Sequence, residues 1–194
     1  MQVHSKIPAM LLLLLTASQS HAEWTLDGSA SSFFYVTTKA AAVTEVNSFS
    51  GLTGTISDEG KASLVIDLAT VNTAVEIRDQ RMREIAFQVA NFPEATVSVD
   101  VDAEALDGMS AGVSTTGSYT AHVTLHGVTQ DLMADLQITK LVDDSVLVQI
   151  ARPLIVAAPA FDLQAGVDEL QKVAALSSIT PSVVVDFTMV YRKQ

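Results

Sequence analysis

Apolar and polar residues alternate with a period of two along most of the chain after residue 23, and this alternation constrains the fold more than any other feature. In residues 96–102, for example, Val97, Val99 and Val101 lie on one face of an extended segment, and serine and aspartate side chains lie on the other. We expect strands near residues 31–38, 45–57, 61–70, 96–102, 119–127, 131–138, 145–156 and 183–191. About eight short strands, each with one apolar face, predict an all-β fold, either an antiparallel barrel or a sandwich.

Turn-forming residues separate the expected strands. Such turns are predicted at residues 58–60, 106–108, 126–127 and 143–144. The alternation changes phase between Phe49 and Leu52, on either side of Gly51. A glycine at a change of phase indicates a bulge or a bend in the strand.

Two segments interrupt the alternation with apolar residues at helical spacing. Met82 and Ile85 belong to a partial apolar stripe in residues 76–87, and Leu170 belongs to a second stripe in residues 165–176. We expect two short helices that plug or flank the sheet.

Residues 1–22 have the features of a secretory signal peptide. An apolar run covers residues 7–17, and small residues precede a predicted cleavage between Ala22 and Glu23. The alternative is a transmembrane anchor, but the run holds about 11 residues, whereas a bilayer core needs roughly 20. The short, leucine-rich signal is of a bacterial kind. It predicts a periplasmic domain of residues 23–194 without a stable membrane anchor.

The composition excludes several classes of protein. The chain carries 11 basic and 22 acidic residues, a formal net charge of −11, and no cysteine. An acidic protein repels phosphate backbones, so no nucleic-acid partner is predicted. Without cysteine there are no disulfides, no thiolate catalysis and no Cys-ligated metal centre. A hydrophobic fraction of 48% in 194 residues is typical of one compact domain rather than a disordered chain.

No arrangement of residues predicts an enzyme. His122 and His126 lie four residues apart in an expected strand, where about 13 Å would separate their rings. One zinc ion with bonds of about 2 Å cannot bridge that distance, so no metal site is predicted and both side chains are expected on the solvated face. There is no G-x-S-x-G elbow, no convincing His–Asp partner and no phosphate-binding glycine loop. An enzyme acting on small lipids is therefore the weakest hypothesis, and no cofactor is expected.

Arg78, Arg81 and Arg83 form a basic cluster that is unusual in so acidic a chain. In one interpretation they pair with acidic neighbours such as Glu76 and Asp79, which makes a structural ion network near a barrel end. In the other interpretation the cluster clamps an anionic headgroup. We favour the structural network.

The order of several motifs resembles the YceI-like family, in particular its exported, lipocalin-like branch. The matching pieces extend over essentially the whole chain after the signal: residues 24–27, Ser31-x-Phe33-x-Tyr35, Phe49-x-x-Leu52-x-Gly54, residues 66–84, Phe92-Pro93, residues 117–132 and residues 153–187. The most specific feature is T-V-N-T followed closely by R-D-x-R-M-R.

This resemblance implies an antiparallel, eight-stranded, lipocalin-like barrel with two short helices and an elongated apolar pocket. Members of the family are associated with polyisoprenoids, isoprenoid quinones or fatty-acid derivatives, and a homodimer is an expectation by analogy alone. We therefore expect a periplasmic protein that carries or sequesters an amphiphilic lipid. The alternative is a stress-related protein-interaction module whose apolar faces fill the barrel core.

Inward-facing strand residues would line such a pocket, and two aromatic residues after the first helix would close one mouth. The strand residues are Phe33, Tyr35, Leu64, Ile66, Leu68, Val99, Val123, Leu136, Phe187 and Met189, and the mouth residues are Phe87 and Phe92. Each of them is equally compatible with a plain core. The resemblance, not the alternation, favours a cavity.

Overall fold

The structure is a computed structural model that describes residues 24–194, so the predicted signal peptide lies outside the described residues. The strands are β1 (Trp24–Leu26), β2 (Ser32–Lys39), β3 (Val43–Phe49), β4 (Leu52–Thr53), β5 (Thr55–Ile56), β6 (Lys61–Asp67), β7 (Val71–Asn72), β8 (Glu94–Asp100), β9 (Ser114–Leu125), β10 (Val128–Lys140), β11 (Val146–Ile150), β12 (Leu154–Ala157) and β13 (Ser182–Lys193). The helical segments are α1 (Glu76–Arg81), the π-helical η2 (Met82–Ala86), α2 (Ala103–Gly108), α3 (Gln164–Val173) and the 3₁₀ turns η1 (Leu68–Thr70) and η3 (Ala158–Phe161).

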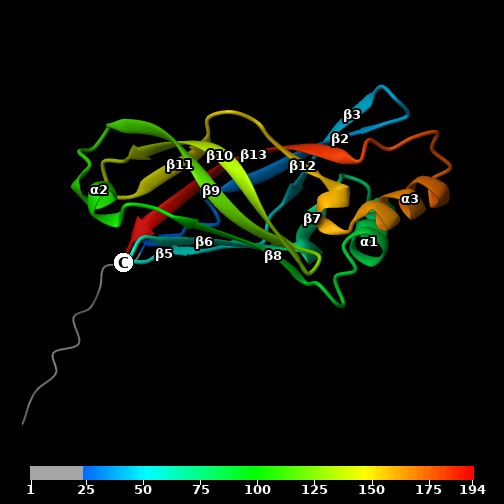
Figure 1. The fold of residues 1–194 in the computed structure, drawn as a ribbon, viewed down its shortest axis with the longest axis horizontal. Coiled ribbons are helices and arrows are strands. Elements are labelled where there is room, and N and C mark those ends of the chain that lie inside the picture. The colour runs from blue at the N-terminus through cyan, green and yellow to red at the C-terminus, as the bar shows by residue number, and fades with distance from the viewer. Residues whose placement is uncertain (1–23) are drawn as a thin grey trace, which may run out of the picture.

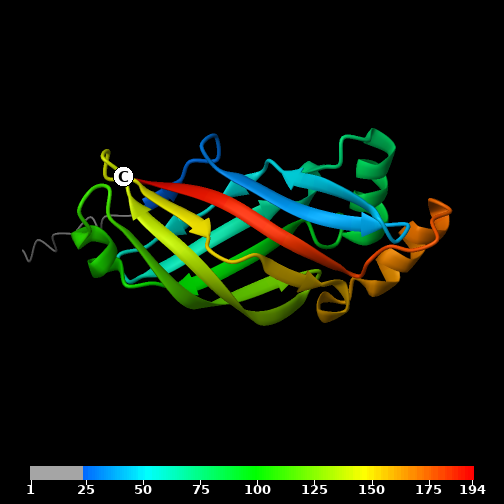
Figure 2. The same cartoon turned by 90° about the horizontal axis from the view of Figure 1, so that it is seen from above.

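The thirteen strands within residues 24–194 follow eight positions around a closed antiparallel barrel. β13 closes the barrel: β1 and β2 pair with one of its edges, and β11 and β12 pair with the other. β3, β4 and β5 form one bent strand that pairs first with β2 and then with β6. When β1 is counted with β2, β6 with β7, and β11 with β12, the eight positions match the eight predicted segments. The predicted barrel is confirmed, and Figure 2 shows β13 crossing its whole length.

Gly51 lies at the bend between β3 and β4. A Cβ there would approach the Cβ of Asp67 to 2.8 Å, so only glycine lets the two backbones come this close. The Gly51 amide donates to Thr70 Oγ1 at 2.9 Å, and the Asp67 amide donates to the Gly51 carbonyl at 2.8 Å. The predicted break in the strand is therefore present, and it redirects the chain from β2 to β6.

The helices cover opposite ends of the barrel (Figures 1 and 2): α2 lies at one end, near the C-terminus, and α1 and α3 lie together at the other. The two predicted helices appear as α1 with η2 and as α3. α3 packs closely on η2 because Gly166 has no side chain; a Cβ there would lie 2.8 Å from the Ile85 carbonyl oxygen. Within residues 24–194 no helix is both long enough and apolar enough to cross a bilayer.

α2 replaces the turn that was predicted at residues 106–108. The Asp102 carboxylate accepts a hydrogen bond from the Ala105 amide at 2.9 Å and so caps the first turn of the helix. Its one buried side chain, Leu106, joins the main core. This helix was not predicted, because about one and a half turns of helix show too little of the 3.6-residue period.

Candidate functional site

The inward-facing side chains leave a cavity of about 550 Å³ inside the barrel. This volume lies within the range of roughly 300–1,000 Å³ that is usual for ligand pockets. The cavity extends from Leu106 and Val146 near α2 to Arg78 and Leu170 near α1 and α3. The barrel is hollow, so the alternative of a filled core is wrong.

All of the predicted lipid-contacting residues except Phe92 line this cavity. They are Phe33, Tyr35, Leu64, Ile66, Leu68, Phe87, Val99, Val123, Leu136, Phe187 and Met189. Phe92 instead packs on the ring of His126 at the β9–β10 turn, with 4.3 Å between ring centroids. Its expected place at a mouth is wrong, because Gln88 and the turn after η2 direct the chain away from the cavity.

The α2 end of the cavity is sealed. Its lining residues Ile56, Ile138 and Val146 are at most 3% exposed. Beyond them lies Trp24, with the ammonium groups of Lys140 and Lys193 at 5.7 and 5.1 Å from its ring. Two cations beside one indole make a compact end behind a lining that is mostly hydrocarbon.

The opposite end opens to the surface between α1, α3 and the β2–β3 hairpin. Ile77 of α1 lines the cavity and is nevertheless 54% exposed. The hairpin tip is held to the segment before β13, since the Ala40 amide donates to the Ser178 carbonyl at 2.9 Å and the Thr180 amide donates to the Thr38 carbonyl at 2.8 Å. We call this end the mouth; it is bounded by Lys39, Val75, Ile77, Arg81, Leu170 and Ile179.

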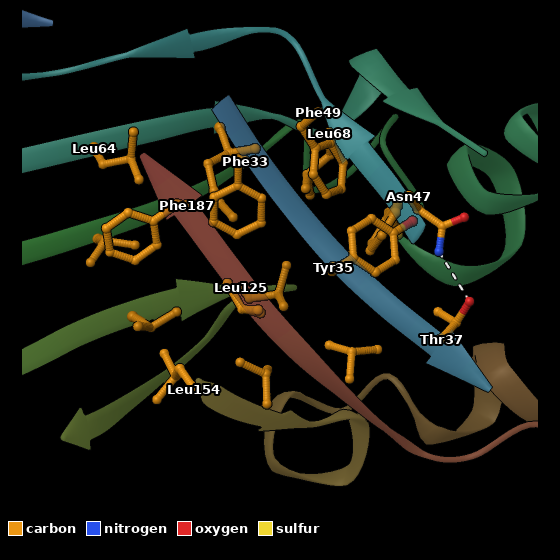
Figure 3. A pocket seen from close by; sticks show the side chains of 18 of the residues that line it. Phe33, Tyr35, Thr37, Asn47, Phe49, Leu64, Leu68, Leu125, Leu154 and Phe187 are labelled. Carbon is orange, nitrogen blue, oxygen red and sulfur yellow. Dashed lines mark hydrogen bonds between the residues drawn. The ribbon is translucent and has the colours of Figure 1, made fainter. Parts of the chain in front are cut away.

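The β2–β3 hairpin becomes more polar toward the mouth (Figure 3). Phe33 pairs with Phe49 at the inner step, Tyr35 with Asn47 at the next, and Thr37 with Glu45 nearest the mouth. The first pair contributes an aromatic cluster, in which Phe33 also stacks on Phe187 with 6.4 Å between ring centroids. At the outer steps, the Asn47 amide donates to Thr37 Oγ1 at 3.0 Å. Along this hairpin the inward-facing side chains thus change from aromatic in the interior to charged at the mouth.

Glu45 joins the hairpin to α1. Its carboxylate lies 2.7 Å from both Lys39 Nζ and an Arg78 guanidinium nitrogen, and Arg78 also donates to the Thr73 carbonyl at 2.5 Å. The hydrogen bond from Lys39, with help from Arg78, lowers the pKa of Glu45 below its ordinary value of 4.5. Arg78 therefore takes part in a structural ion network at the mouth, but with a strand residue rather than with the expected neighbours in sequence.

The other two arginines of the cluster separate. Arg81 lines the cavity, and among residues 24–194 it has no ion-pair or hydrogen-bond partner. Arg83 lies instead in a shallow depression between η2 and the start of α3, outside the main cavity. Of the acidic neighbours, Asp79 accepts from the Thr73 amide at 2.7 Å, and Glu84 accepts from Gln80 at 2.9 Å.

Two tyrosines face the cavity with very different hydroxyl environments. Tyr191, near the sealed end, donates to the Ser63 carbonyl at 3.1 Å, and burial raises its pKa to about 12. Tyr35 is 5% exposed, and its hydroxyl is buried with no hydrogen-bond partner within the described chain. Burial, assisted by Asp79, raises the pKa of Tyr35 well above its usual range, so the phenol stays protonated.

The polar residues of the cavity near the mouth were not predicted from the sequence. Thr37, Asn47 and Thr73 line the cavity although their side chains are polar. The period-two alternation assigns polar strand residues such as Thr37 and Asn47 to the solvated face, and Thr73 follows the end of β7. Parity offered a signal for two of them: Asn47 shares the inward parity of Phe49, and Thr37 shares that of Phe33 and Tyr35.

The two histidines lie outside the cavity. His122 projects from β9 and bonds Asp131 at 2.6 Å, with 48% of its side chain exposed. The prediction that no histidine has an aspartate partner is therefore wrong. The strand register also places Ser98 opposite His122. No Ser98–His122 hydrogen bond is present between these described residues, and the row lies on the outer face. His126 is not outward on a strand as expected; with Gly127 it forms the β9–β10 turn at positive φ, and its ring is covered by Phe92.

The chain belongs to the YceI-like family, since the YceI-like domain model matches residues 24–191. It is similar to a polyisoprenoid-binding domain from Saccharophagus degradans implicated in plant cell wall breakdown, with 36% identity, a TM-score of 0.87, and coverage of 88% of this chain and 98% of that one. It shares its fold with BcnA of Burkholderia cenocepacia at 16% identity and a TM-score of 0.66, with coverage of 85% and 98%. No curated protein matches the chain.

Proposed function

We propose that this protein binds an isoprenoid-type or similar amphiphilic lipid in its barrel and carries or sequesters that lipid in the periplasm. The observation that carries the proposal is the apolar cavity of about 550 Å³, sealed at one end and open at the other. The Saccharophagus relative, at 36% identity over nearly its whole length, is a polyisoprenoid-binding domain, which supports the same ligand class. Export rests on the signal predicted at residues 1–22.

Burial alone supplies enough free energy for such a ligand. A chain of about 20 methylene-like carbons gains on the order of 16 kcal/mol on leaving water, and about half of this gain remains if association costs take the other half. Because the lining near the sealed end is mostly hydrocarbon and the Tyr191 hydroxyl there already bonds to the Ser63 carbonyl, we expect the cavity to discriminate little among apolar tails. The proposed role is non-catalytic binding, with affinity that depends on shape and desolvation.

Native mass spectrometry of the protein purified from a periplasmic extract tests the proposal. We expect an adduct of several hundred daltons that partitions into organic solvent. Ala134, which is 4% exposed, lines the cavity, whereas its neighbour Met133 is 59% exposed on the outer face. Ala134→Phe should therefore lose most of the adduct, and Met133→Phe, with the same new side chain, should keep it.

Two results would contradict the proposal. One is a wild-type protein that carries no lipid and also fails to bind added prenyl lipids. The other is an equal adduct on both variants, because a lipid outside the barrel would not distinguish the inner face of β10 from the outer.

A further inference from the structure

The hydroxyl of Tyr35 is the most unusual polar group in the cavity. The side chain is 5% exposed, and its oxygen has no hydrogen-bond partner among residues 24–194. A buried hydroxyl without a partner is destabilising relative to one that is satisfied, because it has lost its bonds to water and gained none. The other cavity tyrosine, Tyr191, shows the usual solution, a bond to a backbone carbonyl. Because no protein group within residues 24–194 satisfies the Tyr35 hydroxyl, it is free to bond to a molecule that enters the cavity.

Tyr35 lies where a lipid changes from tail to head. The preceding inward pair on the hairpin is Phe33 with Phe49, and the Tyr35 ring stacks on Phe49 with 5.4 Å between centroids. Figure 3 shows Tyr35 between this aromatic cluster and Asn47. A tail that fills the sealed part of the cavity would thus bring its first polar atom to the Tyr35–Asn47 step.

The charges around this step favour a neutral ligand group. Arg78 and Lys39 are both engaged by Glu45, and Asp79 opposes Arg78 in its effect on the Tyr35 hydroxyl. Arg81, the cation on the cavity wall without an acidic partner in the described part of the chain, belongs to α1 at the mouth. An anion at Tyr35 would depend on Arg78, whose charge Glu45 already offsets although its buried Nε has no partner among residues 24–194, or on Arg81 at the mouth. A carbonyl oxygen requires only a donor.

We propose that the Tyr35 hydroxyl donates a hydrogen bond to an uncharged acceptor oxygen, of the carbonyl type, on the head of the bound lipid. The lipid then lies with its tail toward Val146 and its head toward the mouth. Tyr35 makes the cavity selective for oxygen-bearing isoprenoids over plain hydrocarbons of the same length. This inference rests on the proposed lipid-binding function and specifies the ligand for the same site.

Binding of three isoprenoids with one tail, ending in an aldehyde, a carboxylate or a methyl group, tests the inference by titration. Tyr35→Phe should weaken aldehyde binding about three- to tenfold, the effect of one neutral hydrogen bond. It should leave the methyl-ended lipid within about twofold. Tyr191→Phe is the matched control: it removes a cavity hydroxyl that already has a protein partner, so the aldehyde-to-methyl ratio should not change.

The possible outcomes distinguish this inference from the proposed lipid-binding function. If Tyr35→Phe changes the affinity for the three lipids equally, the hydroxyl contacts no head group and the inference fails while lipid binding stands. If the carboxylate binds tightest and loses most in Tyr35→Phe, the ligand group is anionic and the inference is overturned. If wild-type protein binds none of the three, both fail. Thermal unfolding of each variant confirms that a lost affinity is not lost fold.

Discussion

The two ends of the barrel use the same alternating strands for opposite purposes. At the α2 end, Val146 is fully buried, Trp24 is 2% exposed, and the Tyr191 hydroxyl is satisfied by Ser63. At the mouth, Ile77 is 54% exposed, and the Tyr35 hydroxyl has no partner within the described residues. The comparison teaches that the two ends differ in access and not simply in satisfied polar groups. The Trp24 indole N–H is also buried without a partner among residues 24–194, but it lies outside the cavity lining, whereas Tyr35 lines the cavity.

The largest effect is expected from removing Trp24. Trp24→Ala should lower the free energy of unfolding by about 3–5 kcal/mol, because it leaves a cavity in a sealed end and removes the ring beneath two ammonium groups. Ile77→Ala at the mouth should change it by at most about 0.5 kcal/mol, because the side chain is already half exposed. Urea denaturation measures both. Equal losses would show that the two ends contribute alike to stability.

A smaller effect is expected from the two tyrosine hydroxyls in the ligand-free protein. Tyr191→Phe should destabilise by about 1 kcal/mol, since it breaks the bond to the Ser63 carbonyl. Tyr35→Phe should leave stability unchanged or slightly raised, since it removes a hydroxyl that has no partner. Thermal unfolding of delipidated samples compares them. A destabilised Tyr35→Phe would mean that its hydroxyl is satisfied without ligand.

The smallest effect on stability is expected at Glu45, whose ion pairs join the hairpin to α1 at the mouth. Glu45→Gln should cost less than about 1 kcal/mol at pH 7, as is usual for partly exposed pairs. Because the folded pKa of Glu45 lies below 4.5, its contribution is fully present above the unfolded pKa and is lost as the pH falls through the folded value. Stabilities of variant and wild type, measured from pH 7 downward, should converge in acid. A difference in stability that does not change with pH would show that the charge of Glu45 is not its cause.

Much of the fold could be predicted, because strands report their burial directly in alternation. Lys61–Asp67 and Glu94–Asp100 show clean alternation and pair with each other as neighbouring strands of the barrel. The phase change at Gly51 correctly marked a bend. α2 was missed because it is short. Phe92 was misplaced because the turn at Gln88 directs it away from the cavity, and its ring packs on His126 of the distant β9–β10 turn.

The site was less predictable for a physical reason. Inward parity identifies which side chains face the interior, but it does not tell whether they meet across it. The partner of Arg78 illustrates the limit: local spacing suggested acidic neighbours on the helix, yet Glu45, thirty-three residues away, forms the ion pair. Contacts of that kind follow from how α1 docks on the hairpin.

The amino-acid sequence by itself determined the eight strands, their inward faces and the two larger helices, since these depend on local periodicity. Only the tertiary structure decided that the barrel is hollow, that it is sealed at Trp24 and open at Ile77, and that Tyr35 is left unsatisfied among the described residues. The volume between strands depends on the barrel's closure and on side chains brought together from distant segments. No local sequence pattern encodes this volume.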